Sequence, residues 1–340
     1  LLLNYFTHHL FLYLLQWLST VKEVTKELLP LVRVYKDGSV ERPVGSPYVP
    51  SSPDQDPETG VSSKDITISH NPVISARLYL PKLTQSDKKC PILVYFHGGG
   101  FCIESSFSFL DHRYLNALVS QSQVVAVSVE YRLAPEHPLP AAYQDSWAAL
   151  QWVTSHKIAE DPNKEPWLLK YGDFDRVFIG GDSAGGNIAH NIAMQAGVES
   201  LPNDVKIAGA ILSHPYFWGS RPIGSEPSDN HEKSFSCLVW EFVYPSASGG
   251  IDNEMVNPVG PGKPSLAKLG CSRLLVCVAG KDSLRDRGIW YVDAVKESGF
   301  EGEVELFEVE GEDHAFHVFY PETQSAKDMI RRLASFINCR

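Results

Sequence analysis

Closely spaced cysteines are missing from this sequence. None of the six forms a CxxC pair or a cysteine and histidine cluster with zinc-ligand spacing. We therefore expect no metal site and no organic cofactor, and reduced thiols in a reducing, cytoplasmic compartment. Cys277, inside the apolar run "LLVCVAG", is expected to be a core residue and not a nucleophile. The six are Cys90, Cys102, Cys237, Cys271, Cys277 and Cys339.

Basic residues are also comparatively few. Thirty Lys and Arg stand against 41 Asp and Glu, which gives a net charge of -11. A charge of this sign repels phosphate backbones and anionic membrane surfaces, so nucleic acid is not an expected partner. Internal repeats, low-complexity tracts and a linker between halves are missing as well. With 43% hydrophobic and 21% charged residues, the sequence predicts a folded, water-soluble chain with one large core.

The first 21 residues are apolar but do not have the pattern of a membrane span. Asn4, His8 and Gln16 interrupt the run, no basic region precedes it, and no small-residue cleavage site is clear. We expect residues 1–21 to be an extension, such as an amphipathic helix, without stable membrane insertion. A secretory signal or anchor is the alternative, because residues missing before Leu1 could supply a basic region.

Short apolar runs rich in β-branched residues alternate with helical patterns through most of the chain. The runs predict strands buried on both faces, and their alternation with helices predicts an α/β fold with a mostly parallel, doubly wound sheet. Helices are expected after Phe109, over 141–156, from Asn187, over 285–299 and over 322–338. The strands are expected at 77–80, 91–96, 124–131, 177–181, 209–212, 274–280 and 304–309.

Two segments break this alternation. Residues 30–62 are rich in Pro, Ser, Asp and Gly, and residues 215–265 carry aromatics and prolines with few strand signals. A segment as long as the second, inside a compact enzyme, is commonly functional, and we interpret it as a lid. The sequence thus predicts a single domain over 22–340, with cap contributions from 22–62 and 215–265.

The stretch "GDSAG" places Ser183 between glycines, after a predicted strand and before a predicted helix. This is the context of a nucleophile elbow, in which a sharp turn exposes the serine and small neighbours leave room for approaching backbone. The positive end of the helix that starts near Gly185 would favour an anion at the site. Because short patterns of common residues occur by chance, a tight structural turn is the alternative.

Three successive glycines follow another predicted strand in "HGGGF". Their conformational cost is understandable if the N–H groups of Gly98, Gly99 or Gly100 approach a substrate oxyanion, together with the N–H of Ala184. A flexible loop is the alternative. His97 is expected to be structural within the loop and not a general base.

A serine hydroxyl needs a base, and a carboxylate that orients it, in the chain order Ser, Asp, His. His314 lies in a loop after a predicted strand, whereas His317 belongs to the next apolar run and is expected to be packed or capping. Asp282 directly follows the strand that ends in "CVAGK", whereas Asp286 falls in the first turn of a helix. We therefore prefer His314 and Asp282 as base and orienter.

Taken in order, these motifs resemble the plant carboxylesterases of the hormone-sensitive-lipase group, which have the α/β-hydrolase fold. The resemblance also includes "EYRLAPEHPLPAAYQD" (130–145), "KDSLRD" (281–286) and "EDHAF" (312–316), and it extends from about Lys22 to the C-terminus. It implies Ser183 as nucleophile, Asp282 as orienter, His314 as base, and the glycine loop with Ala184 as oxyanion hole.

Within that group the chain looks most like the 2-hydroxyisoflavanone dehydratase subfamily, on stretches such as "PYFWGSRPIGSEP" and "GKDSLRDRGIWY". Legume dehydratases of this type have threonine at the nucleophile position, where this chain has Ser183. The methyl group of threonine crowds acyl transfer, so serine favours ester hydrolysis.

Three functions are therefore open at this stage. The first is a carboxylesterase acting on small or medium esters, and the second is a dehydratase acting on a flavonoid. The third is a hormone receptor of the gibberellin-receptor type, but such receptors have lost the catalytic histidine that His314 supplies here. The oligomeric state does not follow from the sequence.

Overall fold

The computed structural model describes residues 22–83, 89–158 and 164–339. The chain divides into two compact units, which meet in sequence between Val44 and Gly45. The expected helix over residues 1–21 lies outside the described residues. The predicted cap contributions of 22–62 and 215–265 stay predictions.

The described part of the first unit is a small antiparallel sheet. Its strands pair in chain order, and β2 lies in the segment 30–62, which the sequence analysis treated as irregular. The strands are β1 (Val24–Leu28), β2 (Val32–Tyr35) and β3 (Val40–Glu41).

The second unit is built on an eight-stranded sheet within the described residues, in the order β11-β10-β9-β8-β6-β7-β5-β4. Neighbours from β11 to β7 run parallel, whereas β5 and β4 are antiparallel additions at one edge. The mostly parallel sheet is thus confirmed. The strands are β4 (Ser62–His70), β5 (Val73–Leu80), β6 (Cys90–Phe96), β7 (Val125–Glu130), β8 (Gly172–Asp182), β9 (Ile207–Ser213), β10 (Arg273–Ala279) and β11 (Glu303–Val309).

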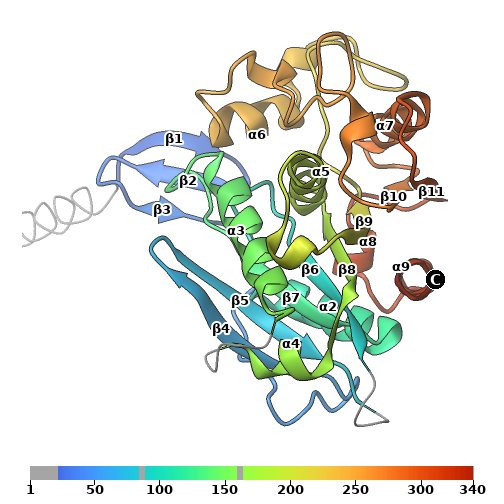
Figure 1. Ribbon diagram of the computed structural model, residues 1–340. Coiled ribbons are helices and arrows are strands. Elements are labelled where there is room, and N and C mark those ends of the chain that lie inside the picture. The colour runs from blue at the N-terminus through green and yellow to red at the C-terminus, as the bar shows by residue number, and fades with distance from the viewer. Residues whose placement is uncertain (1–21, 84–88, 159–163, 340) are drawn as a thin grey trace, which may run out of the picture. The chain divides into compact units, whose positions relative to one another are not determined.

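Helices cover both faces of this sheet (Figure 1). On one face α2 and α9 pack their apolar side chains, among them Leu115 and Ile330, against sheet residues such as Phe178. On the other, α5 packs on β8 and β9, with α3 beside it and α7 on β10 and β11. The helices are α2 (Phe109–Ser122), α3 (Ala141–Ser155), α4 (Pro166–Tyr171), α5 (Ala184–Ala196), α6 (Phe235–Val243), α7 (Arg285–Glu297), α8 (Phe316–Phe319) and α9 (Gln324–Asn338).

The strands and helices differ from the sequence-based expectation at three places. β11 is an edge strand and is only half buried, with Leu306 38% exposed, because it has a neighbour on one side alone. β4 was not expected, since its alternation of half-buried and exposed residues contains polar side chains on both faces. The segment 215–265 contains no strand, as expected, but it includes the helix α6.

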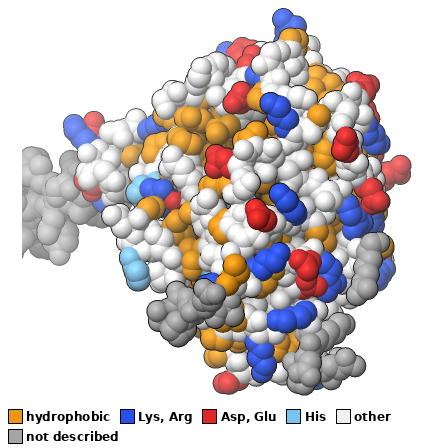
Figure 2. Space-filling model, viewed as in Figure 1, with side chains coloured by type: hydrophobic (Ala, Val, Ile, Leu, Met, Phe, Trp, Pro, Cys, Tyr) orange, Lys and Arg blue, Asp and Glu red, His pale blue; other side chains and the backbone are white. Residues whose placement is uncertain are grey.

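The face of the molecule in Figure 2 carries acidic and basic side chains interspersed with one another. The described residues on this face do not gather Lys and Arg into one large patch. In the described parts of the chain, no helix is long and apolar enough to cross a membrane.

Candidate active site

Ser183 occupies the sharp turn between β8 and α5. Its backbone has φ 54° and ψ -116°, a region that residues with a Cβ rarely adopt. The strain is held by hydrogen bonds on both sides of the residue: Ser183 N–H donates to Ser213 O at 2.9 Å, and Ser183 O accepts from Tyr216 N–H at 3.0 Å. The turn leaves the serine side chain partly exposed at the carboxyl end of the parallel strands.

Close backbone packing explains the glycine that follows. A Cβ atom on Gly185 would lie 1.9 Å from Phe96 O and 2.7 Å from His97 O, so only glycine fits. The glycine loop after β6 therefore lies directly against the turn that carries Ser183.

Tyr131 fixes the start of the glycine loop. Its hydroxyl donates to His97 O at 2.7 Å, and its ring stacks on the His97 ring with centroids 4.2 Å apart. His97 is buried, and its Nδ1 is hydrogen-bonded to Gly98 O at 2.8 Å. This environment agrees with a structural histidine.

The loop beyond Gly98 turns through Gly99, whose φ of +98° requires glycine. Gly99 and Gly100 are partly exposed, whereas Gly98 is buried. Ala184 is the first residue of α5 and is also buried. Its position places it at the positive end of the helix dipole.

Asp182, which the sequence analysis did not single out, packs against this loop at Gly98. Its Oδ1 accepts from the Tyr95 hydroxyl at 2.6 Å, and its Oδ2 would lie 2.3 Å from a Cβ on Gly98. Burial raises the pKa of Asp182, and the Tyr95 hydrogen bond offsets part of this rise. Its place beside the serine in "GDSAG" was the available signal.

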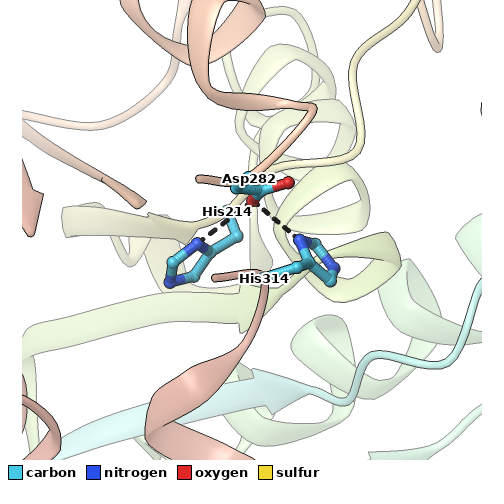
Figure 3. Close-up of side chains that lie close together, drawn as sticks. All are labelled: His214, Asp282 and His314. Atoms are coloured by element: carbon cyan, nitrogen blue, oxygen red, sulfur yellow. Dashed lines mark hydrogen bonds and ion pairs between the residues drawn. The ribbon is translucent and has the colours of Figure 1, made fainter. Parts of the chain in front are cut away.

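The three predicted triad residues lie in one hydrogen-bonded chain. His314 Nε2 is 2.9 Å from Ser183 Oγ. His314 Nδ1 is 2.7 Å from Asp282 Oδ2 (Figure 3). The residues come from three separate loops at the carboxyl end of the sheet, after β8, β10 and β11. The structure thus brings together side chains that are 131 and 32 positions apart in sequence.

The two alternatives lie elsewhere. Asp286, in the first turn of α7, accepts from Ser225 N–H at 2.6 Å and from the Ser225 hydroxyl at 2.8 Å. His317 is fully buried in α8, and its ring stacks on His214 with centroids 5.2 Å apart. Neither residue takes the place expected for Asp282 or His314.

The pKa shifts of Asp282 and His314 suit an ionised carboxylate and a base. Burial would raise the pKa of Asp282, but hydrogen bonds from His214 and His314 hold it well below its usual range. Burial lowers the pKa of His314, and the bond to Asp282 and the negative charge of Asp282 and Asp182 outweigh this, so the net shift is upward. Asp282 is therefore ionised at neutral pH.

His214 is the second histidine bonded to this carboxylate, and the sequence analysis missed it. Its Nδ1 lies 3.3 Å from Asp282 Oδ2, and the residue is buried directly after β9 (Figure 3). No local motif marks it. The available signal was its position at the carboxyl end of the strand next to that of Ser183.

The same side chains form the one group in the described residues that could offer three metal ligands. Nitrogen and oxygen atoms of His214, Asp282 and His314 all lie within 4.8 Å of one another. Their spacing follows from two histidines that share one carboxylate oxygen. We assign no cofactor to these residues.

Comparison with known proteins agrees with this architecture. A family model described as the alpha/beta hydrolase fold matches residues 93–318. A solved structure of an esterase from Pyrobaculum calidifontis superposes with a TM-score of 0.65 and 29% identity, covering 81% of this chain and 84% of that one.

Two plant proteins are similar over nearly their full length. A 2-hydroxyisoflavanone dehydratase from Glycyrrhiza echinata is 61% identical over 321 residues, covering 94% of this chain and 98% of that protein. A probable carboxylesterase 2 from Arabidopsis thaliana is 46% identical, covering 94% and 98%. On the sheet order, the family match and these relatives, the chain belongs to the α/β hydrolase fold family.

Proposed function

We propose that this protein is a serine carboxylesterase that hydrolyses small or medium esters. The observation that carries the proposal is the chain of hydrogen bonds from Asp282 through His314 to Ser183, with Ser183 in a strained, partly exposed turn. The glycine loop packed against that turn provides the second element that acyl transfer needs.

In the proposed reaction, Ser183 Oγ attacks the ester carbonyl carbon while His314 Nε2 accepts the hydroxyl proton. The carbonyl oxygen becomes an oxyanion, stabilised by the N–H groups of the glycine loop and Ala184. His314 then gives the proton to the leaving alcohol. A water molecule, deprotonated by His314, releases the carboxylic acid and restores Ser183.

Asp282 contributes by orientation and charge. Its bond to Nδ1 fixes the tautomer in which His314 Nε2 carries a lone pair toward Ser183. Its negative charge also stabilises the imidazolium that forms when His314 takes the proton.

A second function is favoured by the relative with 61% identity, which is named a 2-hydroxyisoflavanone dehydratase. In this elimination His314 would remove the proton α to the substrate ketone while the loop N–H groups polarise the carbonyl oxygen. The hydroxyl group at the neighbouring carbon would leave with the proton as water. Ser183 need not form a covalent bond in this reaction.

The two functions are separated by assaying p-nitrophenyl acetate and butyrate beside 2-hydroxyisoflavanone on the wild type, Ser183→Ala and His314→Ala. The esterase proposal expects wild-type ester cleavage that falls by at least about 10³-fold in Ser183→Ala. Ester cleavage that survives in Ser183→Ala would contradict it. Isoflavone formation that survives in Ser183→Ala but is lost in His314→Ala would support the elimination instead.

A further inference from the structure

The segment after β9 connects the nucleophile to the triad carboxylate. Ser213 O accepts from Ser183 N–H at 2.9 Å, and Tyr216 N–H donates to Ser183 O at 3.0 Å. Between these two residues, His214 N–H donates to Cys277 O of β10 at 2.8 Å. Four consecutive residues therefore hold the backbone on both sides of the serine and attach it to the strand that leads to Asp282.

The side chain of His214 completes this connection. Asp282 accepts three hydrogen bonds: Leu284 N–H donates to Oδ1 at 2.9 Å, and the two histidines share Oδ2. An ionised carboxylate only accepts, so His214 Nδ1 must carry a proton. His214 is fully buried and has no acidic partner other than Asp282 within ion-pair distance among the described residues, which favours a neutral ring with Nε2 unprotonated.

We propose that His214 is a positioning residue of the active site, which donates Nδ1–H to Asp282 and so sets the orientation and basicity of the carboxylate that holds His314. This inference rests on the proposed triad. His214 and His314 donate to the same oxygen, Asp282 Oδ2. The bond from His214 therefore weakens the hydrogen bond that Asp282 accepts from His314 Nδ1.

Other titratable groups lie close to His214 and Asp282 on the neighbouring elements. His317 of α8 stacks on His214, His314 lies across Asp282, and Asp182 at the end of β8 carries a buried carboxyl. Burial lowers the pKa values of His214 and His317. The pKa of His314 is shifted in the opposite direction, upward, by its bond to Asp282.

The test compares His214→Leu, which removes the donor, with His214→Asn, whose amide nitrogen occupies the place of Nδ1. Asn also tolerates the positive φ of 48° at this position. We expect kcat for p-nitrophenyl butyrate to fall about 10-fold in His214→Leu, and the acid limb of kcat/KM to move up by about half a pH unit. His214→Asn should restore the wild-type midpoint.

The matched control is His317→Phe, which keeps a ring stacked on His214 and removes no hydrogen bond to Asp282. It should leave the acid midpoint unchanged. An unchanged midpoint in His214→Leu, or an equal shift in His317→Phe, overturns the proposal.

A direct measurement covers the case in which His214→Leu does not fold. Nitrogen NMR of labelled histidines in the wild-type protein should show His214 neutral and protonated on Nδ1 above pH 6.5, the ordinary pKa from which burial lowers this residue. Protonation on Nε2 instead overturns the proposal. Because this readout does not depend on turnover, absence of esterase activity in the wild type would refute the proposed function while the role of His214 is still decided.

Discussion

Arg287 and Glu226 form a bidentate ion pair inside the second unit. Arg287 Nε lies 2.6 Å from Glu226 Oε1 and Nη2 lies 2.8 Å from Oε2, with only 3% and 2% of the two side chains exposed. Arg287 belongs to α7, which follows Asp282, and Glu226 belongs to the segment 215–265. Together with the Asp286 bonds to Ser225, the pair attaches this segment to α7 at two neighbouring points.

Replacing Glu226 with Gln should destabilise the protein by about 3 kcal/mol, because the Arg287 charge would stay buried without its counter-charge. The free energy of unfolding in urea measures this effect. The matched control is Asp328→Asn, which breaks a pair with Arg331 on the exposed surface of α9. That change should cost less than about 1 kcal/mol. Equal losses in the two variants would contradict the assigned role of burial.

Replacing Tyr131 with Phe should lower kcat for esters about 10-fold with little change in KM, because the glycine loop loses the bond that holds His97 O. Steady-state kinetics on p-nitrophenyl esters provide the measurement. Tyr79→Phe is the control: Tyr79 is also buried, and its hydroxyl is bonded to His112 Nδ1 at 3.1 Å on the other side of β7. It should reduce stability but not kcat.

The pH dependence of ester cleavage should report the raised pKa of His314. Since the base acts as neutral imidazole, kcat/KM falls as the pH falls through this pKa, and the midpoint of the acid limb should lie above 6.5. A midpoint at or below 6.5 would disagree with the strong bond to Asp282.

In Asp282→Asn, kcat should drop by about 10⁴-fold, because the amide can fix the wrong tautomer of His314.

His190 should make the protein sensitive to acid. It is 2% exposed on α5, and burial lowers its pKa from 6.5 to about 3. Below pH 6.5 the unfolded chain binds a proton at this residue and the folded chain does not, so stability falls as the pH falls toward 3. Between pH 7 and pH 5 the loss from this one residue should be about 2 kcal/mol.

The measurement is the free energy of unfolding at these two pH values for the wild type and His190→Gln. Gln has no titration in this range and offers a polar group to the Tyr291 hydroxyl, which lies 2.9 Å from His190 Nδ1. The difference between the two pH values should be smaller in the variant by about 2 kcal/mol. An equal difference in both proteins would place the acid sensitivity elsewhere.

The strands and helices that carry the candidate site could be predicted from sequence because each has a strong local pattern. The run "PILVYF" and the helix with Met329 and Ile330 are examples, and both lie where expected. β4 could not be found in this way, since its hydrogen bonds to β5 and not an apolar pattern define it. Helix α6 was missed because prolines and glycines surround it in sequence.

In the candidate site, too, some residues could be found from local sequence patterns and others could not. Ser183 and Gly98 stand in recognisable motifs, and the order of the chain leads from them to Asp282 and His314. His214 and Tyr131 act through contacts with residues 68 and 34 positions away. Such contacts are fixed by the strand order of the sheet, and spacing along the chain does not encode them.

The short segment after β9 has a consequence for how this scaffold can change its substrate. Its residues from Ser213 to Tyr216 hold the serine and the carboxylate, and the chain then continues without interruption into the segment that ends near residue 265. On the predicted role of this segment as a lid, we expect variation beyond Tyr216 to alter which substrate is accepted, while residues 213–216 hold the proposed reacting groups in place. New specificities should be obtained most readily by exchanging residues 227–262 as a block, which leaves residues 213–216 and the buried Glu226–Arg287 pair unchanged.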